Sequence, residues 1–187
     1  MRRVRYIRTM PRILIALLTL ITCTAAETAV VDFEKSPPAL ASRNEALTGS
    51  IVEQTVAGRP GTRLLLLRPQ WNADSSGSVT MPAALPAGSA ELVLWLRGSS
   101  AGSKLQINLV AEDGGLFTAT VDVPAEPGST VTVPYRTLVF NKWSKVPAEA
   151  SRTFAAGSIR KLMLTTYKDL AGQTPAERIL LDDPTAR

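Results

Sequence analysis

The sequence predicts an all-β domain, built as a sandwich or a barrel, and three observations lead to this prediction. Short apolar-rich runs recur along the 187 residues, and clusters of Gly, Pro, Ser and Asn separate them. The 13 prolines and 12 glycines suit turns better than helices. No amphipathic helix of convincing length is present, although 137–143 and 148–154 can each hold a single helical turn.

The strands are expected where the apolar runs fall. In most runs apolar and polar residues alternate, so that one face of the strand is buried and the other is polar. The run from Leu64 to Leu67 is apolar throughout, which predicts a central strand covered on both sides. In chain order the runs cover 29–34, 50–56, 62–68, 78–81, 90–97, 104–111, 116–122, 130–135, 159–165 and 178–182.

The alternation is clearest in the sixth of these runs. Leu105, Ile107 and Leu109 share one face, whereas Gln106 and Asn108 point the other way. The next four residues read Glu-Asp-Gly-Gly, which is a hairpin signal, and the strand after them follows the same rule with outward threonines. We therefore expect a sheet with one buried face and one face that is polar but weakly charged.

The N-terminal segment, residues 1–26, has the pattern of a secretory signal peptide and leaves 27–187 as the domain. Five arginines precede the apolar run from Ile13 to Ile21, and Thr24-Ala25-Ala26 supplies small residues for cleavage. This run is much shorter than the roughly 20 residues that a spanning helix needs. An uncleaved anchor and lipidation at Cys23 are the alternatives, and Thr22 disfavours the second. We expect a secreted or periplasmic protein with no membrane attachment after leader removal.

Charge and composition exclude several functional classes. Five of the 21 basic residues lie in the leader, which leaves 16 basic against 16 acidic residues in the domain. The domain therefore lacks the excess of positive charge that nucleic-acid binding normally requires. The single Cys also lies in the leader and His is absent, so the domain has no thiol nucleophile, no imidazole base and no His/Cys metal site. These absences predict that the protein is not an enzyme.

The ends of the domain and the strands between them carry a resemblance. The first strand contains Val31-Asp32-Phe33-Glu34 and the last contains Ile179-Leu180-Leu181-Asp182-Asp183, with Leu92 to Gly98, Leu105 to Leu109 and Val131 to Tyr135 between them. This order resembles the galactose-binding-like jelly-roll family, which includes many carbohydrate-binding modules attached to polysaccharide-degrading enzymes. The resemblance implies a two-sheet antiparallel β-sandwich, a jelly roll, whose termini lie close together.

The same resemblance implies a structural calcium ion beside the first and last strands. The matching oxygens belong to Glu34 and Asp182, with Asp183 as a further candidate. Calcium takes several carboxylate and carbonyl oxygens at about 2.3–2.6 Å, so the residue types are suitable. The alternative is that the two acids and Pro184 only end a strand with turn chemistry, and Pro184 departs from the apolar residue usual in the family.

Sugar binding needs aromatic faces that stack on a pyranose ring and polar groups that bind its hydroxyls. The candidate contacts are Trp95, on the non-core face of its strand, and Gln106 and Asn108, which we expect beside it together with outward threonines. Trp71 and Trp143 lie in loops and complete the set. For each tryptophan the alternative is a packing role, under a covering loop or at the edge of the core.

The predicted function is that of a secreted, non-catalytic carbohydrate-binding module whose partner is a polysaccharide or another glycan. The alternative is a structural or adhesion domain whose polar sheet face docks another protein at the cell surface. Glu112 and Asp113 are adjacent carboxylates, but they precede a Gly-Gly turn and point apart. Glycoside hydrolysis needs two carboxyl groups that face a shared substrate, so we assign this pair to the turn.

Overall fold

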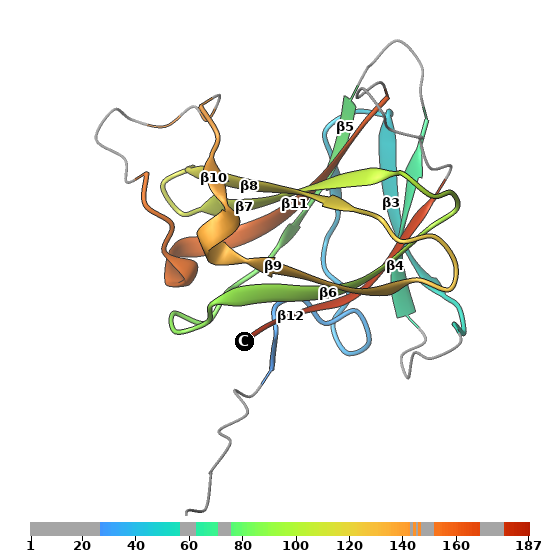
Figure 1. Cartoon of the computed structure of the whole chain (residues 1–187), viewed down its shortest axis with the longest axis horizontal. Coiled ribbons are helices and arrows are strands. Elements are labelled where there is room, and N and C mark those ends of the chain that lie inside the picture. The colour runs from blue at the N-terminus through green and yellow to red at the C-terminus, as the bar shows by residue number, and fades with distance from the viewer. Residues whose placement is uncertain are drawn as a thin grey trace, which may run out of the picture.

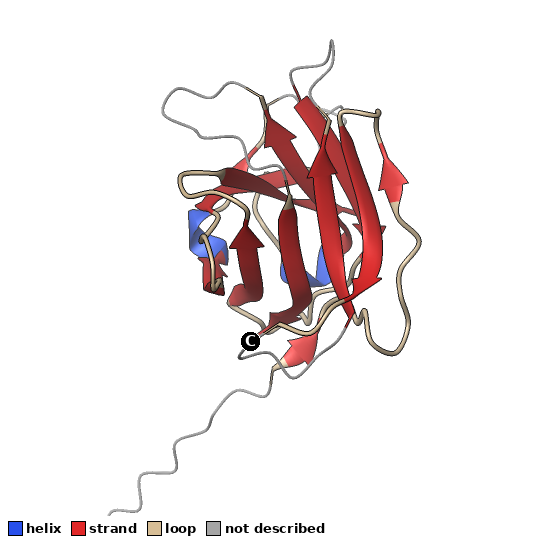
Figure 2. Ribbon diagram, turned by 90° about the vertical axis from the view of Figure 1, so that its right-hand side faces the viewer, coloured by secondary structure: helices blue, strands red, loops and turns tan. Residues whose placement is uncertain are grey.

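The computed structural model describes residues 27–56, 63–70, 76–142, 144, 146, 152–168 and 178–187. Two antiparallel sheets of six strands each stack face to face, and within these residues helix is limited to two short turns (Figures 1 and 2). The predicted all-β sandwich is therefore confirmed. The predicted leader, 1–26, lies outside the described residues.

The two sheets divide the strands without following chain order. Sheet A has the order β3-β4-β12-β6-β9, with β1 paired to β12, and sheet B has the order β10-β8-β7-β11-β5-β2. The strands of sheet A are β1 (Thr28–Ala29), β3 (Leu47–Glu53), β4 (Arg63–Pro69), β6 (Glu91–Gly98), β9 (Ser129–Pro134) and β12 (Ile179–Ala186). Those of sheet B are β2 (Ala41–Ser42), β5 (Ser76–Pro82), β7 (Lys104–Ala111), β8 (Leu116–Asp122), β10 (Val139–Phe140) and β11 (Ile159–Tyr167). The short 3₁₀ turns are η1 (Tyr135–Thr137) and η2 (Ala156–Ser158).

The first and last strands of the domain lie side by side. Thr28 is opposite Ala186, and β12 itself lies between β4 and β6 at the centre of sheet A (Figure 1). The expected proximity of the two ends of the domain is thus confirmed. Because β12 is the last strand of the described chain, sheet A is completed only by a long-range pairing.

The main core lies between the sheets and follows the predicted alternation. Leu92, Leu94 and Leu96 of β6 point inward from sheet A and are at most 1% exposed. Their counterparts in β7 are the three apolar residues of the clearest predicted alternation, and all of them are fully buried. Full burial of a large apolar side chain stabilises the fold by about 1.5–3 kcal/mol. This burial fixes which residues of every strand face outward.

A second, smaller apolar cluster covers the outer face of sheet A. Its buried members are Val56, Leu64, Leu66, Trp95 and Leu180. Because Leu64 and Leu66 belong to this cluster while the alternate leucines of β4 enter the main core, the prediction of a strand covered on both faces is confirmed.

The predicted position of Trp95 beside the polar face is wrong. Trp95 lies on β6 in sheet A, whereas Gln106 and Asn108 lie on β7 in sheet B. The indole is only 7% exposed, and the turn at Gly128 packs against it so closely that a Cβ there would lie 2.5 Å from Trp95 Cζ2. Around Trp95 the non-core face of β6 is covered, because the turn at Gly128 and the apolar side chains of Leu66 and Leu180 enclose the indole. Trp95 has a packing role.

Several element boundaries also differ from the sequence-based expectation. The expected first strand, 29–34, is reduced to Thr28–Ala29, because Asp32 Oδ1 accepts a hydrogen bond from the Lys35 amide at 2.8 Å and forms a turn. The last strand extends to Ala186 through a register shift between Asp182 and Thr185, which accommodates the proline. In 137–143 the structure has the short strand β10 after η1. No helix within the described ranges is long and apolar enough to cross a membrane.

We predict that Leu94→Asp and Ile107→Asp each abolish stable folding. A carboxylate at either position would be buried between the sheets without a partner, which costs about 4 kcal/mol or more. Denaturant unfolding followed by tryptophan fluorescence measures the loss. Thr132→Asp, at an exposed position of β9, is the matched control and should change stability little. Wild-type stability of the Leu94 variant would contradict the assignment of faces.

Candidate functional site: a groove on the outer face of sheet B

Short polar side chains cover the outer face of sheet B in register. Gln106 of β7 lies opposite Thr120 on one side and Thr165 on the other. One step along the strand, Asn108 lies between Thr118 and Met163. These positions are outward because their neighbours in each strand enter the core. The sheet therefore presents amide and hydroxyl groups where sheet A presents its second apolar cluster.

Two adjoining recesses follow this face and together form what we call the sheet-B groove. They measure about 650 and 520 Å³, and each falls in the size range of small-molecule sites. Gln106, Asn141 and Tyr167 line both recesses, so the two are continuous. The remaining lining residues are Arg43, Ser76, Gly77, Ser78, Asn108, Leu116, Thr118, Ala119, Thr120, Thr137, Val139, Phe140, Lys142, Met163 and Thr165.

A hydrogen-bond network fixes the floor of the groove. The amide nitrogen of Asn108 donates to Thr165 Oγ1 at 3.1 Å and to the Met163 carbonyl at 3.2 Å. Its amide oxygen accepts from Thr118 Oγ1 at 2.8 Å. Asn108 is completely buried, so its side chain links β8, β7 and β11 beneath the surface. A ligand in the groove would meet the residues that Asn108 holds in place.

Tyr167 supplies an aromatic ring at the wall of the groove. It is the last residue of β11, and its hydroxyl donates to Gln106 Oε1 at 2.8 Å. Partial burial raises the pKa of Tyr167 above its ordinary value, although the hydrogen bond with Gln106 and the charge of Arg43 lower it in part. The phenol is therefore neutral at physiological pH. It can offer both a flat face and a hydrogen-bonding hydroxyl to a ligand.

Phe140 is a second aromatic residue of the groove, in the short edge strand β10. Its ring packs edge to face against Phe117, with the ring centroids 5.5 Å apart. The guanidinium of Arg152 lies 5.6 Å from the Phe140 centroid. This end of the groove therefore combines an aromatic ring, anchored on the core, with a nearby cation.

The groove brings together only part of the predicted site. Gln106 and Asn108 line it, whereas Trp95 lies on the other sheet and Trp71 and Trp143 fall outside the described residues. The strand expected at 159–165 stopped short of Tyr167, and the structure places this residue at the end of β11. Its position follows the outward series Met163, Thr165 and Tyr167, but the adjacent threonines at 165 and 166 hide this alternation in the sequence.

Arg43 and Phe140 have no comparable signal in the sequence. Arg43 follows a strand of two residues, Ala41–Ser42, and Phe140 ends another two-residue strand. Strands of this length show no alternation, and only the pairing with β5 and β8 places them at the edges of sheet B. Their contribution to the groove is a property of the assembled sheet.

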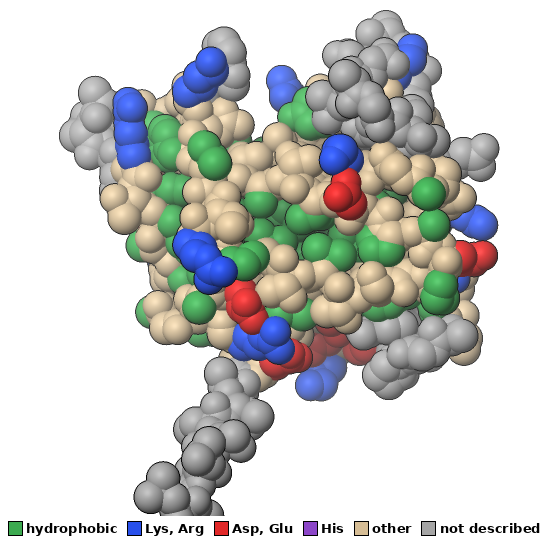
Figure 3. Space-filling view, viewed as in Figure 1, with side chains coloured by type: hydrophobic (Ala, Val, Ile, Leu, Met, Phe, Trp, Pro, Cys, Tyr) green, Lys and Arg blue, Asp and Glu red, His purple; other side chains and the backbone are tan. Residues whose placement is uncertain are grey.

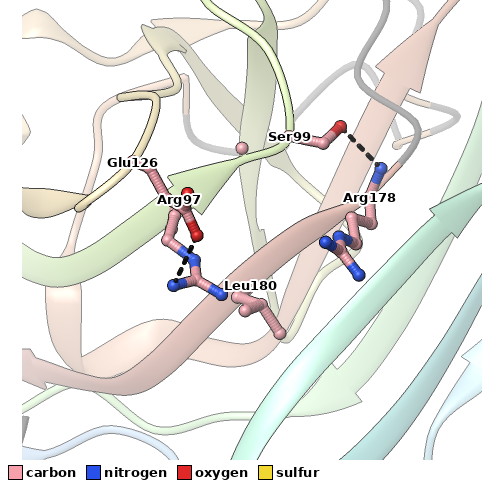
Figure 4. A pocket seen from close by; sticks show the side chains of 6 residues that line it. Arg97, Ser99, Glu126, Arg178 and Leu180 are labelled. Carbon is pink, nitrogen blue, oxygen red and sulfur yellow. Dashed lines mark hydrogen bonds and ion pairs between the residues drawn. The ribbon is translucent and has the colours of Figure 1, made fainter. Parts of the chain in front are cut away.

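A recess on sheet A is much smaller than the sheet-B groove (Figure 4). It measures about 90 Å³, which is well below the size of a sugar-binding pocket. Arg97 Nη1 lies 3.2 Å from Glu126 Oε1 across it, and Ser99 Oγ accepts from the Arg178 amide at 3.3 Å. Arg97 and Glu126 thus neutralise one another, and the recess is too small to hold a sugar ring.

The acids expected to bind calcium serve as acceptors for backbone amides. Glu34 Oε1 accepts from the Arg63 amide at 2.7 Å, and Asp182 Oδ1 accepts from the Asp183 amide at 2.8 Å. Asp183 Oδ1 accepts from the Phe33 amide and so joins the last strand to the first turn. Within the described ranges, no group of three or more Asp, Glu, His or Cys side chains is placed to hold a metal ion. The calcium site stays a prediction.

The comparisons with known proteins identify the fold and no closer relationship. No family model matches the sequence, and no curated protein matches it. Among solved structures, a family 11 carbohydrate-binding module from Clostridium thermocellum, in complex with a β-1,3-1,4-mixed-linked tetrasaccharide, aligns with a TM-score of 0.64. It is 8% identical, and the alignment covers 87% of this chain and 96% of that one. The chain therefore has a β-sandwich fold similar to that of a carbohydrate-binding module.

Two further structures have the same architecture. A family 30 carbohydrate-binding module of a cellulosomal cellulase of Clostridium thermocellum aligns with a TM-score of 0.60 and 13% identity, over 87% of this chain and 97% of that one. An exo-β-agarase aligns with a TM-score of 0.59 and 12% identity, over 86% of this chain and 25% of the enzyme. The resemblance inferred from the sequence is thus confirmed for the fold.

We predict that Asn108→Ala destabilises the protein by about 2–4 kcal/mol, because it leaves buried partners on two neighbouring strands without their hydrogen bonds. Thr120→Ala is the matched control, since Thr120 is exposed on the same face. The control should stay within about 0.5 kcal/mol of the wild type in urea unfolding. Equal stability of the two variants would show that the network does not support the sheet.

Proposed function

We propose that this protein binds carbohydrate reversibly through the sheet-B groove and carries out no reaction there. The observation that carries the proposal is the composition of the groove, in which the Tyr167 ring stands beside amide and hydroxyl groups on a rigid sheet. A pyranose has apolar C–H faces and a rim of hydroxyls. It therefore matches a surface that combines an aromatic face with polar groups at fixed positions.

The residues of the groove are of two kinds. Some are expected to touch a ligand, and others hold these residues in position. Gln106 and Tyr167 border both recesses, and their shared hydrogen bond orients the two side chains toward one another. Asn108 is buried and saturated with hydrogen bonds, so it positions the threonines around it. We expect a ligand to contact Gln106 and Tyr167 directly. Trp71 and Trp143 are retained as expected ligand contacts from loops outside the described residues.

The solved structures with a similar fold support the proposal by analogy. The family 11 module is described in complex with a tetrasaccharide, and the agarase holds a similar sandwich as a quarter of its chain. A likeness of fold does not transfer a ligand, because function depends on the residues of the site. The analogy therefore supports the class of ligand, and the groove itself must supply the specificity.

The carboxylates of the β7–β8 hairpin support a binding role without catalysis. Glu112 Oε2 forms an ion pair with Arg160 Nη2 at 2.7 Å, and Asp113 Oδ1 accepts from the Gly115 amide at 2.8 Å. Both acids thus stabilise the turn, where Gly114 has a φ of 87°. Neither lines the sheet-B groove. A glycosidase would need a pair of carboxyl groups across the substrate.

The same proposal places the protein outside the cytoplasm, secreted or periplasmic, since the first 26 residues have the composition of a leader. The competing function is that of a structural or adhesion domain whose polar sheet face docks a protein at the cell surface. The two functions differ in what the groove must accept. A sugar requires the Tyr167 ring to be available for stacking, whereas a protein partner would bury much more of the sheet than the groove alone.

We predict that Tyr167→Ala weakens polysaccharide binding by about tenfold or more, because stacking and one hydrogen-bonding group are lost. Tyr167→Phe should retain most of the affinity. Affinity electrophoresis against a panel of soluble polysaccharides, followed by calorimetry with the best one, measures the change. Thr132→Ala on sheet A is the control. Binding that all three variants retain would exclude this groove as the sugar site and favour the protein-docking role.

A structural calcium ion at Glu34 and Asp182 is a separate part of the proposal. Its support is the pair of acids in the last strand, of which Asp182 is only 2% exposed, next to the turn that follows β1. Carboxylate oxygens are preferred ligands of Ca²⁺, so these acids have suitable chemistry. Calcium added to EDTA-treated protein should raise the Tm, and Asp182→Ala should remove this rise. An unchanged Tm in the wild type would exclude the ion.

A further inference from the structure

We propose that the ligand of the sheet-B groove is an anionic polysaccharide, whose sugar rings carry carboxylate or sulfate groups. This inference rests on the proposed carbohydrate-binding function and specifies the chemistry of its ligand. It depends on the charges that line the groove, and above all on Arg43. A neutral sugar chain would make no use of these charges.

The described lining of the groove contains positive charge and no negative charge. Arg43 borders one recess and Lys142 the other. No Asp or Glu is found among the described residues that line either recess. The only carboxylate on the outward positions of β8 is Asp122, whose Oδ1 lies 2.8 Å from Lys104 Nζ, so this pair is neutral overall. Arg43 therefore brings to the described lining a positive charge that no carboxylate of that lining offsets.

Arg43 is held at the edge of the groove while its side chain is exposed. Its backbone amide donates to the Ser78 carbonyl at 2.9 Å, which fixes the residue next to β5. Its charge also acts on Tyr167, the aromatic residue of the same recess. A guanidinium beside a flat ring can bind an anionic substituent in a bidentate manner while the sugar ring stacks on the aromatic face.

Arg43 differs from several other arginines in its ion pairing. No carboxylate within the described ranges forms an ion pair with Arg43. Elsewhere on the surface, ion pairs with Glu neutralise a set of arginines, namely Arg63 with Glu53, Arg97 with Glu126, Arg160 with Glu112 and Arg187 with Glu91. Glutamates thus offset the charges of these four arginines, whereas the guanidinium of Arg43 in the groove is available for a ligand.

The positions of the cations suit a chain more than a single sugar. Arg43 follows β2 and Lys142 follows β10, and these strands are the two edges of sheet B. Five strand spacings of about 4.8 Å separate the two edges by roughly 24 Å along the sheet. Arg152, beside Phe140, adds a cation at the β10 end. A polysaccharide with a charged group on successive rings can reach both ends of the groove.

The surface view agrees with this distribution. Along the upper margin of the molecule, above β10 and β8, Lys and Arg side chains stand out and no Asp or Glu is visible among the coloured residues (Figure 3). The Asp and Glu side chains visible in that view lie below this margin (Figure 3). A nucleic acid is the other polyanion to consider. The balanced charge of residues 27–187 disfavours it, because nucleic-acid binding depends on many phosphate contacts.

The test compares anionic and neutral polysaccharides as ligands of the exported protein. Polygalacturonate provides carboxylates and carrageenan provides sulfates, while mixed-linkage β-glucan and agarose are the neutral probes, and single-stranded DNA is included as a different polyanion. We expect at least tenfold tighter binding to one of the anionic polysaccharides than to the neutral ones. We also expect this binding to weaken as salt is raised.

Arg43→Gln should reduce the preference for the anionic polysaccharide by about tenfold, and Arg43→Lys should restore only part of it. The matched control is Arg68→Gln, which removes the same charge from an exposed position of β4 on sheet A and should change affinity less than twofold. All these side chains are exposed, so the Tm of each variant should equal that of the wild type.

The possible failures are distinguishable. Equal binding to neutral and anionic polysaccharides, dependent on Tyr167 but unaffected by Arg43→Gln, would overturn the anionic ligand and leave the carbohydrate-binding function intact. Binding to no polysaccharide by folded protein would overturn the proposed function itself. Tighter retention of DNA than of any polysaccharide would overturn both in favour of a nucleic-acid partner.

Discussion

The packing of the two inner sheet faces against each other is the interaction on which the rest of the structure depends. Leucine and isoleucine side chains from β6 and β7 meet in this interface and are almost completely removed from water. Because a strand has only two faces, burial of one set of side chains forces the other set outward. The position of Gln106 on the surface is thus a consequence of the burial of Leu105 and Ile107.

The outer faces of the two sheets differ, although in both sheets the side chains alternate between the core and the outer face. On sheet A, Trp95 and Leu180 form a second apolar cluster, and the turn at Gly128 closes over the indole. On sheet B, the outward positions are hydroxyls and amides, and recesses remain above them. A small domain gains stability by covering one outer face with apolar residues, and it keeps the other face available for a ligand. Among the described residues, this asymmetry leaves the larger recesses on the outer face of sheet B.

The sequence predicted the sheets better than it predicted the site. Alternation in β7 and β8 identified both strands and the hairpin between them, and it placed Gln106 and Asn108 on an outward face. The same reasoning failed for Trp95, because a non-core position in a strand is exposed only if nothing covers it. The turn at Gly128 covers the Trp95 indole in the folded protein. This turn is far from Trp95 in the sequence, and no local pattern indicates that the two lie together.

The sequence by itself determined the fold class and the inward or outward direction of residues in each long strand, because period-two burial is a local property. Only the tertiary structure decided which strands are neighbours. The pairing of β12 between β4 and β6, and the placement of two-residue strands at the edges of sheet B, join segments that are far apart in the chain. Arg43 and Phe140 reach the groove through those edge pairings, so their role follows from long-range contacts that no local pattern encodes.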